Sequence, residues 1–151
     1  MELDFSSETL EKLLLKRALL DKGWLNILSN VYDKRWFKVD GAGFVVKLII
    51  NFYKKYNSIP NNAIVQEMAK RYFEKYPTND GLSLSIVQQL LTEVANLEFN
   101  LPEDVLNSNL KEFIRRNAFY NSLYDNAELL DKNPENYEKV VDKCLENFDR
   151  V

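Results

Sequence analysis

The sequence contains no histidine, and this absence restricts the chemistry open to the chain. Histidine is the commonest general base in enzymes and the commonest protein ligand of metal ions. Catalytic triads of the Ser-His-Asp or Cys-His type therefore cannot be assembled from this sequence. The single cysteine, Cys144, has no second cysteine for an internal disulfide, and it lies between Val141 and Phe148 on an apolar helical stripe, where we expect it to serve packing.

Glycine and proline are also scarce, with four residues of each in a chain of 151. An all-β protein of this length would need turn residues about every eight to twelve positions, so the composition favours helices. Hydrophobic residues make up 46% of the chain, which is enough for a sizeable core. No uncharged stretch approaches the ~18 residues of a membrane span, and the chain opens without a basic segment followed by an apolar run. We therefore expect a soluble cytoplasmic protein, in the host cytoplasm if a phage encodes it.

The sequence has no phosphate-binding loop of the Walker type, because its four glycines do not have the required spacing. Its net charge of −3 does not favour binding to phosphate backbones either. Basic and aromatic residues do cluster at 52–56, 70–73 and 111–116. The cations of the first two clusters lie in late helical turns and the rings fall largely on predicted core stripes, so strong direct nucleic-acid binding is not expected.

Acidic residues form pairs at a spacing of three, which places two carboxylates on one helix face, as in all-helical magnesium-dependent pyrophosphohydrolases. The pairs are Glu8 with Glu11, Glu135 with Glu138, and Glu146 with Asp149. The first two pairs fall in first helical turns, where the helix dipole and solvent favour acids. Among 23 acidic residues several such pairs arise by chance. We expect no metal or cofactor, and a magnesium-dependent nucleotide pyrophosphohydrolase that uses the last two pairs stays a lesser alternative.

Apolar residues recur at three- and four-residue spacing through most of the chain and predict an all-α fold. The predicted helices cover about 7–21, a short stretch from 24 that ends near 36–37, 44–56, 62–76, 86–94, 103–131 and a final helix after Pro134 that carries 137–148. Ser6 or Ser7 and Asn61 or Asn62 are the expected helix caps. The short turn 132–134 requires the last two helices to be antiparallel. The sequence thus predicts a small helical globule, 1–101, followed by a long helical hairpin, 102–151, in one structural domain.

Three stretches in this order resemble the N-terminal domain of DnaB-like replicative helicases, especially phage members. They are LLLKRALLDKGWLNILSNVYDKRWF near the start, FVVKLIINFYKKYNSIPNNAIVQEM in the middle and LKEFIRRNAFYNSLYDNAELL in the predicted hairpin. The resemblance rests on the order and spacing of these stretches together, and it covers nearly the whole chain.

The resemblance implies a non-enzymatic domain that precedes a linker and a RecA-like ATPase in a DNA replication protein. Paired copies would associate through their hairpins into a collar on which primase or a helicase loader docks, and the chain would end about where the linker begins. The implied self-association residues are Leu110, Ile114, Tyr124, Tyr137, Val141 and Phe148. Several of them can equally face the chain's own core, since a wide apolar stripe serves both kinds of contact. A free-standing helical replication adaptor is the main alternative.

Overall fold

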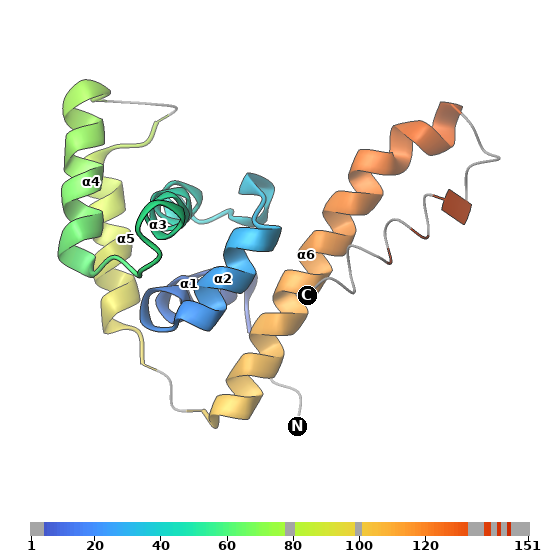
Figure 1. Ribbon diagram of the computed structural model, residues 1–151, viewed down its shortest axis with the longest axis horizontal. Helices are drawn as coiled ribbons and strands as arrows, with labels where there is room; N and C mark the ends of the chain where they lie inside the picture. The colour runs from blue at the N-terminus through green and yellow to red at the C-terminus, as the bar shows by residue number, and fades with distance from the viewer. Residues whose placement is uncertain are drawn as a thin grey trace. The chain divides into compact units, whose positions relative to one another are not determined.

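A computed structural model describes residues 5–77, 81–98 and 101–132, together with Glu138, Lys139, Asp142 and Leu145. The described residues are all-helical, which confirms the fold class predicted from the sequence. The elements are α1 (Ser7–Leu20), α2 (Lys22–Val31), the 3-10 helix η1 (Lys34–Trp36), α3 (Ala42–Tyr56), α4 (Asn62–Lys75), α5 (Leu84–Asn96) and α6 (Glu103–Lys132) (Figure 1). The chain divides into two compact units, Met1–Asn100 with α1 to α5 and Leu101–Val151 with α6.

Polar side chains cap the helices of the first unit where the sequence predicted caps. The Ser6 hydroxyl accepts a hydrogen bond from the backbone N–H of Thr9 at 3.2 Å, and the Asn61 side-chain oxygen accepts one from the N–H of Ile64 at 2.8 Å. Each bond satisfies an amide that the first helical turn leaves without an intrahelical partner. Helix α3 ends at Asn57, which adopts a left-handed conformation with φ of 51°.

The break between the first two helices lies at Asp21, so the prediction that Gly23 interrupts the helix is wrong by two residues. Asp21 has extended backbone geometry and is at once the C-cap of α1 and the N-cap of α2. Its side chain accepts a hydrogen bond from the N–H of Gly23 at 2.8 Å, which places this glycine inside the first turn of α2. A carboxylate that replaces two missing helical bonds explains the break better than the flexibility of a glycine.

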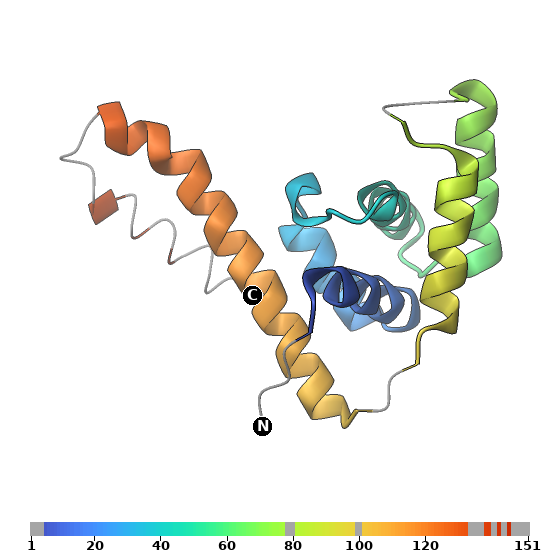
Figure 2. The same ribbon diagram turned by 180° about the vertical axis from the view of Figure 1, so that it is seen from behind.

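The core of the first unit is built from aliphatic residues that α1 to α5 contribute in turn. Helix α1 packs against α2, α3 and α5, while α4 packs against α3 and α5. Figures 1 and 2 show α4 and α5 side by side, with α1 to α3 against them. The fully buried side chains include Leu14, Leu25, Val45, Val65 and Val87, each with no exposed area. At about 25 cal/mol for each Å² of buried apolar surface, such residues supply most of the favourable free energy of folding.

The short second helix ends at Val31, earlier than the sequence predicted, and η1 follows it as a separate turn. Asp33 caps η1 through the N–H of Arg35 at 2.9 Å. This turn directs Trp36 into the core, where 2% of its surface is exposed. The aromatic residues at 36–37 therefore belong to a connection that closes over the core and not to α2.

The second unit contains α6, a helix of 30 residues that covers the predicted first arm of the hairpin. Most of the predicted second arm, 137–148, lies outside the described residues, apart from the four isolated positions given above. The antiparallel hairpin therefore stays a prediction.

Candidate functional site

The six residues predicted to mediate self-association fall into three groups in the structure. Leu110 and Ile114 lie on α6 and are fully buried in the single chain. Tyr124, further along the same helix, is 78% exposed. The other three, Tyr137, Val141 and Phe148, lie outside the described residues. Of the predicted residues that the structure describes, Tyr124 alone presents its side chain to solvent.

The later part of α6 has its polarity reversed relative to an ordinary surface helix. Tyr120 is 60% exposed, Leu123 is 38% exposed and Tyr124 is 78% exposed. Ser122 and Asn126 on the same stretch are 3% and 5% exposed. Asn126 donates a hydrogen bond from its side-chain amide to the carbonyl of Ser122 at 2.7 Å, one turn earlier. Exposed rings beside buried polar groups are typical of a surface that a partner covers.

Sequence reasoning selected Tyr124 and missed Tyr120 and Leu123, although both stand close to it. The spacing of 120, 123 and 124 is three and four residues, which places these side chains on one helix face. The signal was therefore present in the sequence. It was obscured because the apolar stripe of α6 continues from residues that are buried to residues that are exposed, and spacing alone cannot distinguish the two.

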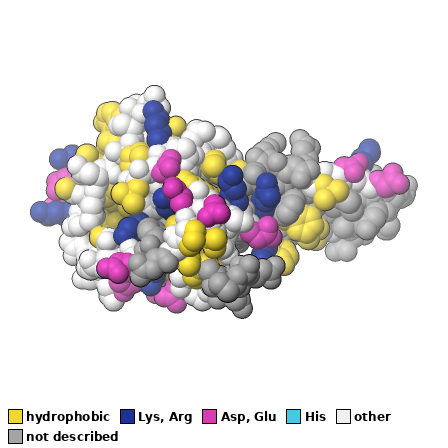
Figure 3. All heavy atoms as spheres, turned by 90° about the horizontal axis from the view of Figure 1, so that it is seen from below, with side chains coloured by type: hydrophobic (Ala, Val, Ile, Leu, Met, Phe, Trp, Pro, Cys, Tyr) yellow, Lys and Arg dark blue, Asp and Glu magenta, His cyan; other side chains and the backbone are white. Residues whose placement is uncertain are grey.

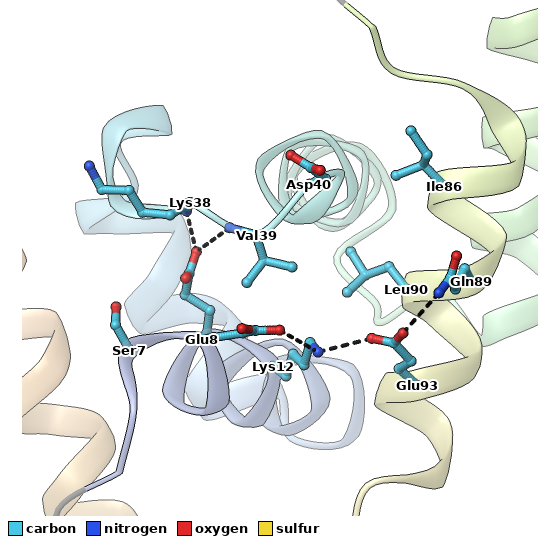
Figure 4. Close-up of a pocket in the computed structure, with 11 residues that line it drawn as sticks. Ser7, Glu8, Lys12, Lys38, Val39, Asp40, Ile86, Gln89, Leu90 and Glu93 are labelled. Atoms are coloured by element: carbon cyan, nitrogen blue, oxygen red, sulfur yellow. Dashed lines mark hydrogen bonds and ion pairs between the residues drawn. The ribbon is translucent and has the colours of Figure 1, made fainter.

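The first unit also holds an open, mixed polar and apolar pocket of about 480 Å³ between α1, the segment 38–40 and α5 (Figure 4). Lys12 lies at its base between two carboxylates, with its ammonium 3.0 Å from Glu8 and 2.9 Å from Glu93. Gln89 donates a hydrogen bond to Glu93 at 3.3 Å. These contacts tie α1 to α5 across the pocket.

The charges in this pocket shift one another's pKa values as expected for paired groups. Hydrogen bonds to Glu93 and Glu8 raise the pKa of Lys12, and the hydrogen bond from Lys12 lowers the pKa of Glu93. The shifts keep all three groups charged near neutral pH. A lysine held by two carboxylates is a structural link and not an activated base.

Glu11 corrects the expectation that the Glu8 and Glu11 pair is a solvated feature of the first helical turn. Its side chain is 1% exposed, and one oxygen accepts hydrogen bonds from the backbone N–H groups of Lys38 and, at 3.2 Å, Val39. The other oxygen has no hydrogen-bond partner among the described residues. Burial raises the pKa of Glu11, while the two backbone hydrogen bonds act in the opposite direction. Glu11 is thus a buried strut that joins α1 to the segment before α3.

The carboxylates do not assemble a metal centre in the part of the chain that the structure describes, where no group of three or more His, Cys, Asp or Glu side chains is placed to hold an ion. Glu8 and Glu11 have different partners, Lys12 for the first and backbone amides for the second. Of the four acids of the alternative hydrolase, Glu138 is described, whereas Glu135, Glu146 and Asp149 are not.

The expectation that the aromatic residues of the third and fourth helices lie in the core is wrong for most of them. In the segment 42–76, Phe73 is buried with 6% of its surface exposed. The other six rings are partly or largely exposed, and they are Phe44, Phe52, Tyr53, Tyr56, Tyr72 and Tyr76. Aliphatic residues on the neighbouring positions fill the core instead, because α3 buries Val45, Val46, Ile49 and Ile50.

Comparisons with protein-family models, with curated proteins and with solved structures give no match to this chain. Within the described residues, no helix combines the length and the apolar character that a membrane crossing requires.

Proposed function

We propose that this chain is a non-enzymatic helical interaction module of the kind found at the N-terminus of DnaB-like replicative helicases. In this proposal it associates with copies of itself through α6 and offers a docking surface to primase or a helicase loader. The all-helical fold and the order of helices agree with the resemblance seen in the sequence. The partners primase and loader come from that resemblance alone.

The observation that carries the self-association is the reversed polarity of α6 over 120–126. Tyr120, Leu123 and Tyr124 expose large apolar side chains on positions that share one helix face. Tyrosine is enriched at the centres of protein interfaces, because it combines a large apolar ring with a hydroxyl. A second copy of the chain is the proposed occupant, because the same face on each copy forms a self-complementary two-fold contact.

Sedimentation equilibrium of the purified chain tests the proposal, with replacement of Tyr120, Leu123 and Tyr124 by glutamine in one variant. We expect the wild-type chain to form dimers or larger assemblies at high concentration. The variant should weaken association at least tenfold, because each removed anchor contributes about 1–2 kcal/mol. Leu20→Gln is the matched control, since Leu20 is 67% exposed on α1 and lies in the other unit.

The control variant should associate like the wild-type chain. A chain that is monomeric at the highest accessible concentration, or a glutamine variant with unchanged association and unchanged helicity, would contradict self-association through α6. The coding sequence downstream of Val151 separates the two versions of the module: a Walker-type loop there supports the helicase, and a stop codon supports the free-standing replication adaptor.

A further inference from the structure

The charges of the chain are unevenly distributed, and the helical pair α3 and α4 carries most of the positive charge. The segment 42–76, here called the α3–α4 hairpin, contains six lysine and arginine residues and two glutamates, a net charge of +4. The whole chain has a net charge of −3, so its remainder carries −7. From Gly41 to Gln66 the sequence contains no acidic residue at all. Such asymmetry favours an anionic partner for this one region.

All six cations of the hairpin are exposed, and they are Lys47, Lys54, Lys55, Lys70, Arg71 and Lys75. Arg71 is bonded to Glu67 at 3.2 Å, one helical turn earlier. In Figure 3, dark blue lysine and arginine side chains gather at the left edge, the side on which Figure 1 places α4. The preference of helix C-termini for cations explains Lys54, Lys55 and Lys75, but it does not explain why acids are missing from the first turns of α3 and α4.

Exposed aromatic rings accompany these cations along the hairpin. Phe52 and Tyr56 have ring centroids 4.6 Å apart near the end of α3, and Tyr72 and Tyr76 have centroids 5.1 Å apart at the end of α4. Tyr56 is 56% exposed and Tyr76 is 48% exposed. Phe44, at the start of α3, contacts Tyr72 with a centroid distance of 4.9 Å, so α3 and α4 are antiparallel and the two exposed tyrosines lie towards opposite ends of the pair.

Each exposed tyrosine has a lysine ammonium close to its ring. The Lys55 ammonium is 5.3 Å from the Tyr56 ring centroid, and the Lys75 ammonium is 5.6 Å from that of Tyr76. A ring that stacks on a base, beside a cation that holds the adjoining phosphate, is the pairing by which proteins bind unpaired strands without sequence preference. The helices are roughly 20 Å long at 1.5 Å per residue, which is enough for about four nucleotides.

We propose that the α3–α4 hairpin is a low-affinity binding face for single-stranded nucleic acid, with Tyr56 and Tyr76 as stacking platforms and the neighbouring lysines as phosphate contacts. The exposed rings favour a nucleic acid over an acidic protein segment, because carboxylates would use the cations and leave the rings in water. The negative remainder of the chain keeps the affinity low. This inference concerns the first unit, and so it does not depend on self-association through α6.

Fluorescence anisotropy with a labelled thymidine oligonucleotide of about 20 nucleotides tests the proposal. Binding should weaken with salt, with a log–log slope of about −2 to −4, since each neutralised phosphate of a single strand contributes about −0.7. An abasic strand of equal length and a polyglutamate of similar length are the competitors. The proposal expects the thymidine strand to compete at least tenfold better than either, because neither competitor offers bases for stacking.

Two variants separate the phosphate contacts from the stacking contacts. The double variant Lys54→Gln with Lys55→Gln should weaken binding roughly tenfold and reduce the magnitude of the salt slope by about 1.4. Its matched control is Lys111→Gln with Arg116→Gln, which removes two exposed cations from α6 and should leave binding within about twofold, although the change in net charge is the same. Tyr56→Leu, which keeps an apolar side chain without the ring, should weaken binding roughly tenfold at an unchanged salt slope.

The outcomes distinguish the proposal from its competitors. Equal competition by the abasic strand or by polyglutamate would show a general anion surface and overturn the nucleic-acid assignment. Equal losses in the α6 control and in the Lys54 and Lys55 variant would show that only net charge matters, and this too would overturn it. Sedimentation of the same variants reports self-association independently, so a failure here leaves the proposed function standing and the converse also holds.

Discussion

The globule formed by α1 to α5 and the long helix α6 use apolar residues in opposite ways. In the globule, Leu14, Leu25 and Val65 are fully buried, and the chain's charged residues lie outside. Over 120–126 of α6, tyrosine and leucine face solvent while Ser122 and Asn126 are buried. The globule thus satisfies its own hydrophobic residues. The later part of α6 does not, and this difference indicates which region is built for a partner.

The comparison also shows that exposed aromatic residues have two different surroundings in this molecule. On α3 and α4 the exposed rings stand beside lysines, in a segment of net charge +4. On α6 the exposed Tyr120 and Tyr124 stand beside another large apolar residue, Leu123. A ring among cations suits an anionic partner, whereas a ring among apolar side chains suits a protein surface.

The largest expected effect comes from a cavity in the core of the globule. Leu14→Ala removes a fully buried side chain and should lower the free energy of unfolding by about 2–5 kcal/mol, measured by urea denaturation. Tyr124→Ala on α6 should change the stability of the monomer by no more than about 0.5 kcal/mol, because the side chain is 78% exposed. Similar losses for the two variants would contradict the contrast between the two regions.

The next largest effect is expected at the buried strut of the globule. Glu11→Ala leaves the backbone N–H groups of Lys38 and Val39 without their acceptor and should cost about 1–3 kcal/mol in unfolding free energy. Glu8→Ala, one turn earlier, is the control, since the Glu8 side chain is 66% exposed and should cost less than about 1 kcal/mol. Equal costs would mean that the buried hydrogen bonds of Glu11 contribute nothing beyond a surface charge.

Much of the fold could be predicted from the sequence, because helix periodicity and capping are local properties. The periodicity located α1, α3, α4 and α6, and the caps at Ser6 and Asn61 were identified from residue type alone. The break at Asp21 was misplaced because a capping carboxylate and a nearby glycine give similar signals in sequence. Which positions of a wide stripe become buried is set by tertiary packing, so periodicity could not separate Ile114 from Tyr124.

The roles of individual polar residues were harder to predict than the helices themselves. Glu11 stands three and four residues before Leu14 and Leu15, which puts it on the buried face of α1, and that spacing was the available signal. Its acceptor role was not readable, because Lys38 and Val39 are distant in sequence and come close only in the folded chain. The exposure of the rings on α3 and α4 was missed for the same reason, since the aliphatic residues beside them fill the core.

The pH dependence of stability should be smaller than the loss caused by Glu11→Ala, and its direction follows from burial. Burial raises the pKa of Glu11 in the folded state above its value in the unfolded chain, so the stabilising contribution is present at low pH and is lost as pH rises through the folded pKa. Glu8 on the same helix adds to the rise, while the charge of Lys38 opposes it. Wild type should therefore lose stability relative to Glu11→Gln between about pH 4 and pH 7 in urea titrations. A difference between the two that is constant with pH, or that changes with the opposite sign, would refute this linkage.

The smallest expected effect lies on the outer surface of α4, and it shows how stability and binding separate there. Arg71→Ala removes an exposed ion pair with Glu67 and should change the unfolding free energy by about 0.5 kcal/mol or less, because such pairs contribute about 0.2–0.5 kcal/mol and alanine favours the helix. The same substitution removes one cation from the α3–α4 hairpin, so oligonucleotide affinity should fall severalfold and the salt slope should lose about 0.7 in magnitude. A cost above about 1 kcal/mol in urea denaturation would mean that Arg71 has a structural role within the globule. In that case its cation could not be counted towards a surface that the fold leaves open for a partner.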